Sequence, residues 1–141
     1  MDCPGGYVIP ALDMARSVYA KGLKTIVQTG DGCHSSCSLI FLAGNERVAN
    51  GVLGVHQISG SDDPSVTQTV ISEIYRELVQ FNTPSYLVSR MLRTPPDDIY
   101  IFSPEELEQN SINVRAGDGS EIPHLLAVET WMRKDWLVGV S

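Results

Sequence analysis

The stretch LKTIVQTGDGCHSSCSLIFLAGN (residues 23–45) decides the fold that we expect for this chain. Residues 23–29 form a short run rich in β-branched side chains between two glycines, which is typical of a buried strand. The polar start and apolar continuation of residues 33–43 favour a helix that opens at the surface and runs into the core. The stretch therefore predicts a strand–loop–helix unit with Ser35 and Ser36 at the mouth of the helix.

Helical and strand patterns alternate on both sides of this unit. Apolar residues at spacings of three and four predict helices, and short apolar runs predict strands. The expected helices cover residues 7–22, 66–81 and 84–92, and the expected strands cover residues 52–58 and 99–102. Such alternation predicts one α/β domain over residues 1–141, with a mostly parallel sheet flanked by helices. In such sheets, sites gather at the carboxyl ends of the strands.

The last part of the chain gives weaker signals. Ser103-Pro104-Glu105-Glu106 reads as a capping box with proline at the first helical position, so a brief helix should follow. Beyond Ile112 we expect a small strand and a turn at residues 117–119. The remaining tail carries Trp131 and Trp136, which we interpret as packing against the body or a neighbouring subunit.

Composition excludes several classes of protein. The chain has 43% hydrophobic and 19% charged residues, as globular proteins do. Its formal net charge is −7 and its ten basic residues are scattered, which argues against a nucleic-acid partner and against anionic membrane surfaces. No apolar run approaches the roughly 20 residues of a membrane span, and no signal-peptide pattern opens the segment.

The three cysteines, Cys3, Cys33 and Cys37, are too few for a disulfide scaffold and lack histidine partners at zinc-finger spacing. We therefore expect no metal and no cofactor. In a helical turn, the four-residue separation of Cys33 and Cys37 would put both thiols on one face, within reach of a disulfide. Such a bridge would imply an oxidising compartment. The spacing fits two small buried apolar residues equally well.

The residues of a hydrolase are present, but each has an ordinary explanation. A serine nucleophile needs an imidazole to take its proton, a carboxylate to hold the imidazole, and amide donors for the oxyanion. Ser35 and Ser36 could simply cap a helix. His56 lies in an apolar strand, where a lone histidine is usually a hydrogen-bonded core residue, and Asp97 and Asp98 are ordinary turn residues. Spacing alone does not separate the two readings.

Four segments, in order, resemble landmarks of the proteolytic subunit of Clp protease and its bacterial extracytoplasmic relatives. They are Pro4-Gly5-Gly6-Tyr7-Val8, with Cys3 where the family usually has serine; Cys33 to Gly44; Arg47 to Gln57; and Asp98 to Glu106. The resemblance covers residues 1–112, and the tail at residues 113–141 stays unassigned. It implies the spiral of βα units shared by the Clp protease and crotonase superfamily, without the family's N-terminal strands.

The resemblance also implies roles for individual residues. Ser35 corresponds to the nucleophile, with Ser36 as the fallback, and His56 corresponds to the general base. Asp98 corresponds to the third triad member, and Asp97 is one residue away. The backbone amides of Gly6 and Ser36 would form the oxyanion hole.

The family likeness leads to a ranked set of functions. The first is a serine peptidase-like hydrolase that cleaves peptide or other acyl bonds, acts on a peptide or protein substrate, forms a homo-oligomer and works in an extracytoplasmic, periplasmic location. The second is a crotonase-like enzyme acting on acyl-CoA thioesters through carboxylates. The third is a non-catalytic binding or assembly module that keeps the fold.

Overall fold

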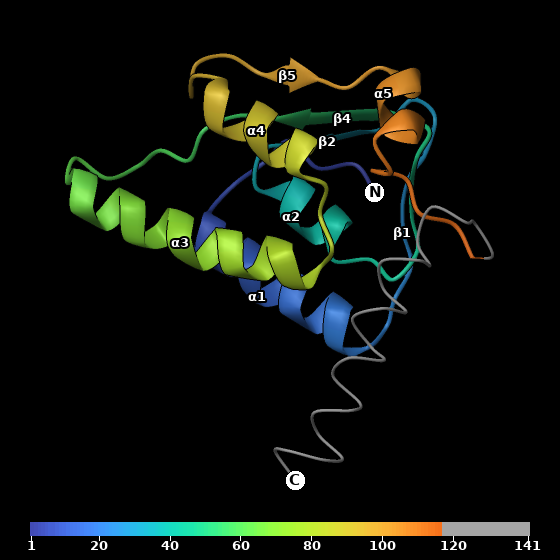
Figure 1. Ribbon diagram of the computed structural model, residues 1–141, viewed down its shortest axis with the longest axis horizontal. Coiled ribbons are helices and arrows are strands. Elements are labelled where there is room, and N and C mark those ends of the chain that lie inside the picture. The colour runs from blue at the N-terminus through green and yellow to red at the C-terminus, as the bar shows by residue number, and fades with distance from the viewer. Residues whose placement is uncertain (117–141) are drawn as a thin grey trace, which may run out of the picture.

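The computed structural model describes residues 1–116 and has an α/β architecture (Figure 1). The expected turn at residues 117–119 and the tryptophans Trp131 and Trp136 lie outside the described residues. The elements follow one another as α1 (Val8–Ala20), β1 (Thr25–Val27), β2 (Gly32–His34), α2 (Cys37–Leu42), β3 (Arg47–Ala49), β4 (Val52–Val55), α3 (Pro64–Gln80), α4 (Ser85–Arg93), β5 (Tyr100–Ile101) and α5 (Pro104–Gln109).

The strands form two small sheets. β1 and β3 pair in parallel, and a three-stranded sheet has the order β2-β4-β5. In the second sheet β2 runs parallel to β4, with His34 opposite Gly54, whereas β5 runs antiparallel to β4, with Tyr100 opposite Val55. Two of the three pairings are thus parallel. β2 and β4 end at the same edge of this sheet, and β5 begins there.

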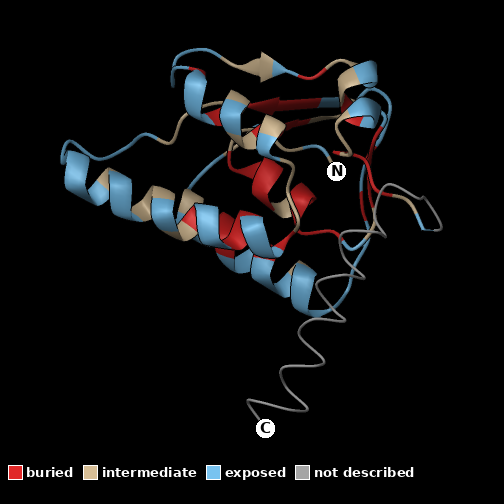
Figure 2. Ribbon diagram, viewed as in Figure 1, coloured by how far each residue is buried: buried red, intermediate tan, exposed pale blue. Residues whose placement is uncertain are grey.

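The core forms around α2, which is central in Figure 2 and mostly buried. Leu39, Phe41 and Leu42 are at most 1% exposed, and the helix contacts α1, β1, β2 and β4. A helix that is apolar on nearly every side is stable only inside a protein, because its side chains cannot be shared between a core and water. This explains why the short apolar run after Ser35 sits between the other elements.

The buried guanidinium of Arg47 donates hydrogen bonds to backbone carbonyls from several segments of the chain. Arg47, at the start of β3, is 2% exposed. Its Nε donates to the carbonyl of Ile112 at 2.8 Å, and its Nη1 donates to those of Leu42 and Phe81 at 2.7 and 2.9 Å. Its Nη2 donates to the carbonyl of Asn82 at 3.1 Å. Burial lowers the pKa of Arg47 to about 10, so the guanidinium is still charged at neutral pH.

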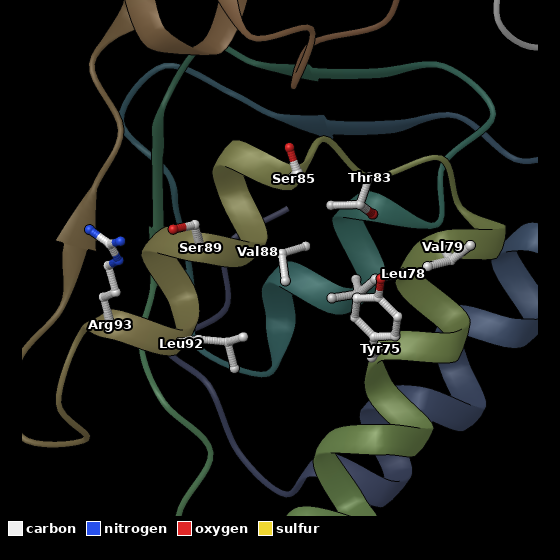
Figure 3. Close-up of a pocket in the computed structure, with 9 residues that line it drawn as sticks. All are labelled: Tyr75, Leu78, Val79, Thr83, Ser85, Val88, Ser89, Leu92 and Arg93. Carbon is white, nitrogen blue, oxygen red and sulfur yellow. The ribbon is translucent and has the colours of Figure 1, made fainter.

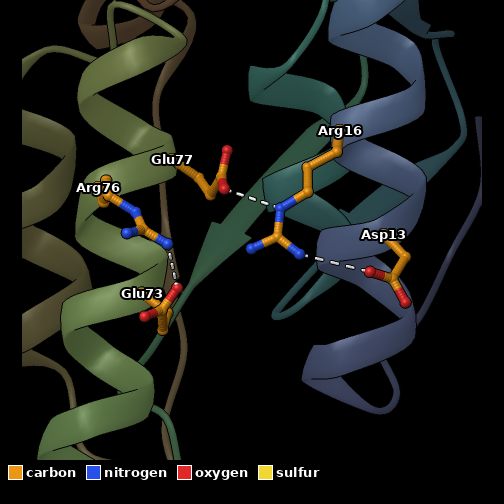
Figure 4. Close-up of polar contacts among 5 residues, drawn as sticks. All are labelled: Asp13, Arg16, Glu73, Arg76 and Glu77. Carbon is orange, nitrogen blue, oxygen red and sulfur yellow. Dashed lines mark hydrogen bonds and ion pairs between the residues drawn. The ribbon is translucent and has the colours of Figure 1, made fainter.

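An ion pair links α1 to α3 (Figure 4). Arg16 Nε donates to Glu77 Oε1 at 2.7 Å, and Glu77 is 8% exposed. The same guanidinium reaches Asp13 at 3.4 Å, and Arg76 pairs with Glu73 at 2.5 Å on the outer side of α3. The hydrogen bond to Glu77 raises the pKa of Arg16. This contact connects the two helices.

The expected helix over residues 33–43 is wrong in its first turn. Cys33 and His34 belong to β2, where their backbones pair with Leu53 and Gly54, and the helix begins only at Cys37. Pairing across the sheet outweighs the local helical pattern here. By contrast, the capping box is confirmed: Ser103 accepts from the amide of Glu106 at 3.2 Å, and Glu106 accepts from the amide of Ser103 at 2.8 Å.

Candidate functional site

Ser35 occupies a sharp turn between a strand and a helix. It follows β2 directly, has a φ of +57°, and lies two residues before α2. Its amide donates to the carbonyl of Gly54 at 3.0 Å, and its carbonyl accepts from Ser38 Oγ at 2.6 Å. A non-glycine residue with positive φ is uncommon, and such residues cluster at active sites. A serine on a strand-to-helix turn of this kind presents its hydroxyl as a nucleophile elbow does.

The Gly5-Gly6 turn lies against Ser35. Gly5 has a φ of +116°, and a Cβ placed on it would lie 3.1 Å from Ser35 Cβ and 3.6 Å from Ser35 Oγ. Both the backbone angle and the space therefore require glycine at this position. Ser36 Oγ donates to the carbonyl of Gly6 at 3.1 Å and ties the turn to the start of α2.

Two amides near this turn have no acceptor. Among the hydrogen bonds within residues 1–116, none uses the backbone N–H of Gly6 or that of Ser36. Ser36 is 3% exposed, and buried backbone N–H groups are nearly always paired. An unpaired amide beside a candidate nucleophile can stabilise negative charge on a substrate oxygen.

Ser35 and Ser36 are placed differently. Ser35 is half-buried, whereas Ser36 is buried and its hydroxyl is engaged with the Gly6 carbonyl. A hydroxyl held inward as a donor is poorly placed to attack a substrate. The geometry therefore favours Ser35 over Ser36 as a nucleophile.

His56 immediately follows β4 and is half-buried. Its Nδ1 lies 2.8 Å from the carbonyl oxygen of Gln57. Because a carbonyl oxygen only accepts, this contact requires the proton on Nδ1 and leaves Nε2 of the neutral ring as an acceptor. That tautomer is the one a general base needs.

Asp98 is exposed and lies two residues before β5. Its carboxylate accepts from the amide of Ile99 at 2.7 Å, and Asp97 is exposed as well. Because β5 is antiparallel to β4, the segment before β5 lies at the edge where β2 and β4 end. The topology thus brings Ser35, His56 and Asp98 to one edge, but no hydrogen bond in the described part of the chain joins any two of them.

Of the two readings of the Cys33–Cys37 spacing, the bridge between them is wrong, and a buried free thiol is confirmed for Cys33 alone. Cys37 is bonded to Cys3, with the two Cα atoms 6.0 Å apart, and Cys33 is a free, fully buried thiol. The reason is that Cys33 lies in β2 and not on the helix that carries Cys37. Burial raises the pKa of the Cys33 thiol to about 12.

A groove of about 590 Å³ begins at the glycine turn. The start of α1, the loop after His56 and the first half of α3 form its walls. Its lining is mainly apolar and small: Gly6, Tyr7, Val8, Ile9, Pro10, Ile58, Ser59, Gly60, Ser61, Thr67 and Val70. A second cleft of about 410 Å³ lies between α3 and α4, where Tyr75, Val88 and Leu92 face it (Figure 3), and none of the candidate residues lines it.

A polar cluster that the sequence analysis missed holds β5 in place. Tyr86 Oη donates to Glu106 Oε1 at 2.5 Å, Tyr100 Oη donates to the same oxygen, and the Arg90 guanidinium lies 4.5 Å from the centre of the Tyr100 ring. Burial pushes the pKa of Glu106 up, but its hydrogen bonds outweigh burial and hold it at about 2. The hydrogen bond to Glu106 raises the pKa of Tyr100. Of these residues, only Glu106 was identified from the sequence, through its place in the capping box.

The remaining findings are negative. Within residues 1–116, no three histidine, cysteine or acidic side chains gather closely enough to hold a metal ion. None of the helices in that region has the length and apolar character needed to cross a membrane. No family model matches the chain, and no curated protein matches it.

Proposed function

We propose that this protein is a serine peptidase-like hydrolase with the spiral βα fold of the Clp protease and crotonase superfamily. One observation carries the proposal: Ser35 sits in a positive-φ turn against Gly5, beside the unpaired amides of Gly6 and Ser36. A helix-capping serine would need neither the unusual backbone angle nor the facing glycine. A nucleophile beside an oxyanion hole uses both.

In the proposed mechanism, Ser35 Oγ attacks the carbonyl carbon of the substrate while His56 Nε2 takes its proton. The amides of Gly6 and Ser36 bind the oxyanion that forms. His56 then gives the proton to the leaving group, and water hydrolyses the acyl-enzyme by the same route in reverse. The Gln57 carbonyl already selects the required tautomer of His56.

Asp98 is the proposed third member of the triad. It lies at the same sheet edge as His56, and its exposed carboxylate can turn without losing a buried partner. His56 Nδ1 donates to the Gln57 carbonyl in the free protein, so Asp98 would replace that carbonyl as acceptor when substrate binds. Catalytic hydrogen bonds are often long or poorly aligned in free enzymes and tighten when substrate binds. Asp97 is the alternative acid, since it is also exposed and one residue away.

The proposed substrate class rests on the groove that begins at Gly6, although Ser35, His56 and Asp98 are not among its lining residues. Its lining includes Val8, Ile9, Ile58 and Val70 and no charged side chain among the described residues. We propose a peptide or other acyl substrate with an apolar group next to the bond that is cleaved. The same lining offers no carboxylate for a crotonase-like reaction on thioesters. The disulfide supports an extracytoplasmic, periplasmic location, and homo-oligomerisation is proposed by likeness alone.

The test is covalent labelling with a serine-directed fluorophosphonate. The wild type should be labelled and Ser35→Ala should not, whereas Ser36→Ala should still be labelled because its backbone amide is kept. Asp98→Asn should slow labelling about 10²-fold or more, and Asp97→Asn should not. Equal labelling of wild type and Ser35→Ala would remove Ser35 from the role, and an unlabelled, folded wild type would favour a non-catalytic module.

A further inference from the structure

The Cys3–Cys37 disulfide joins the two segments that form the proposed oxyanion hole. Cys3 lies two residues before Gly5, and Cys37 lies two residues after Ser35. The bond therefore fixes the glycine turn to the first residue of α2. No other covalent link connects these segments except the long path of the chain between them.

Non-covalent contacts flank the glycine turn on both sides. The Asp2 carboxylate accepts from the amide of Gly32 at 3.0 Å, and Tyr7 is the N-cap residue of α1, which packs on α2. Two backbone hydrogen bonds pair Cys3 with β2, at 2.7 and 3.0 Å, and one side-chain bond links Ser36 to the Gly6 carbonyl. Beyond Cys3 the turn buries little surface: Pro4 and Gly6 are exposed, and Tyr7 is 88% exposed. Within residues 1–116, the disulfide is thus the covalent restraint that joins the glycine turn to the start of α2.

We infer that the Cys3–Cys37 bond is a redox gate for the hydrolase site. With the bond formed, the glycine turn stays against Ser35 and the Gly6 amide is in place. When the bond is reduced, the turn is free to leave and the oxyanion hole loses one of its two donors. This inference rests on the proposed function.

The reductant would be a dithiol, either a small molecule or a protein with a paired-cysteine site. One thiolate attacks a sulfur of the Cys3–Cys37 bond and forms a mixed disulfide, and the second thiol of the reductant then resolves it. Two electrons and two protons pass to the protein, which ends with thiols at Cys3 and Cys37, while the dithiol becomes a disulfide. Cys3 is half-buried and Cys37 is 3% exposed, so Cys3 is the more accessible sulfur.

The Cys33 thiol does not attack the Cys3–Cys37 disulfide. Cys33 is a bridge partner of Cys3 on β2, but its thiol is fully buried. Exchange needs a thiolate, and burial raises the pKa of Cys33 to about 12, so very little thiolate is present at neutral pH. The gate therefore responds to an external reductant, and Cys33→Ala provides a matched control.

The experiment compares oxidised and dithiol-reduced protein by fluorophosphonate labelling and by hydrolysis of an apolar ester, with kcat and KM measured separately. Reduction should lower kcat by about 10²–10³-fold, the usual effect of losing one oxyanion donor. Reoxidation should restore kcat. Cys37→Ser cannot form the bond, so without any reductant it should show the low kcat of reduced wild type. Cys33→Ala should keep the full change in kcat on reduction. Thiol counting by alkylation and mass measurement confirms each redox state.

Each other outcome overturns the inference. Equal labelling of both redox forms, with Ser35→Ala unlabelled, would remove the gate and leave the hydrolase proposal standing. Labelling that does not depend on Ser35 would remove both. Loss of the far-UV helical signal on reduction would show that the bond braces the whole fold and is not a gate. Three alkylated thiols in protein that was never reduced would show that the bond does not form.

Discussion

Arg47→Met should be among the most destabilising single substitutions in this protein. Methionine keeps much of the unbranched stem but removes every donor. Three buried carbonyls, at Leu42, Phe81 and Ile112, and the half-buried carbonyl of Asn82 therefore lose their partner together. A lost partner costs about 1–3 kcal/mol per buried group. Removing the buried charge offsets part of this sum, because a desolvated ion costs several kcal/mol. We expect a net loss of about 3–5 kcal/mol.

The assay is urea unfolding followed by far-UV circular dichroism, with the free energy of unfolding extrapolated to water. Arg76→Met is the matched control: its side chain is 70% exposed and makes one ion pair, with Glu73, so we expect a change of about 0.5 kcal/mol or less. Arg47→Lys has three donors for four carbonyls and should fall between the two. A loss of less than about 1 kcal/mol in Arg47→Met would refute the idea that this cation organises the core.

Two further predictions concern the polar cluster and the glycine turn. The pKa of Glu106 is lowered from 4.5 to about 2, so its stabilisation is complete above pH 4.5 and is lost as pH falls towards 2. Wild-type stability should therefore fall more steeply than that of Glu106→Gln over this window in acid unfolding titrations, and parallel curves would contradict the assignment. Gly5→Ala should slow fluorophosphonate labelling at least about 10-fold, because the added methyl presses on Ser35 from a strained backbone. Gly30→Ala, with a φ of +93° and open space around it, is the control for strain alone and should label normally.

Local patterns were enough to predict much of the architecture. The helices α1, α3 and α4 and the capping box of α5 follow from apolar spacing and cap residues, and the structure confirms them. The strand β3 was not predicted, because its first residue is a charged Arg47 whose partners include carbonyls from two distant segments. No local pattern encodes such an arrangement.

The features of the candidate site also differ in how far the sequence could predict them. The sequence assigned Ser35, His56 and Asp98 through a family resemblance, and their approach to one end of the sheet became visible only in the strand pairing. The disulfide partner of Cys37 was missed because a spacing of four residues means proximity only on a helix, and Cys33 lies on a strand. The backbone contact of His56 with Gln57 also depends on how β4 ends, which sequence spacing does not specify.

The sheltered thiol of Cys33 has a practical consequence. It lies on β2 as a fully buried member of the core, so a thiol reagent reaches it only when β2 separates from its neighbours. When the disulfide is intact, the rate at which a reagent modifies Cys33 measures how often this part of the sheet opens. The free energy of local opening follows from that rate. The wild-type chain thus carries its own single-site reporter of how often the strand leading to Ser35 comes loose.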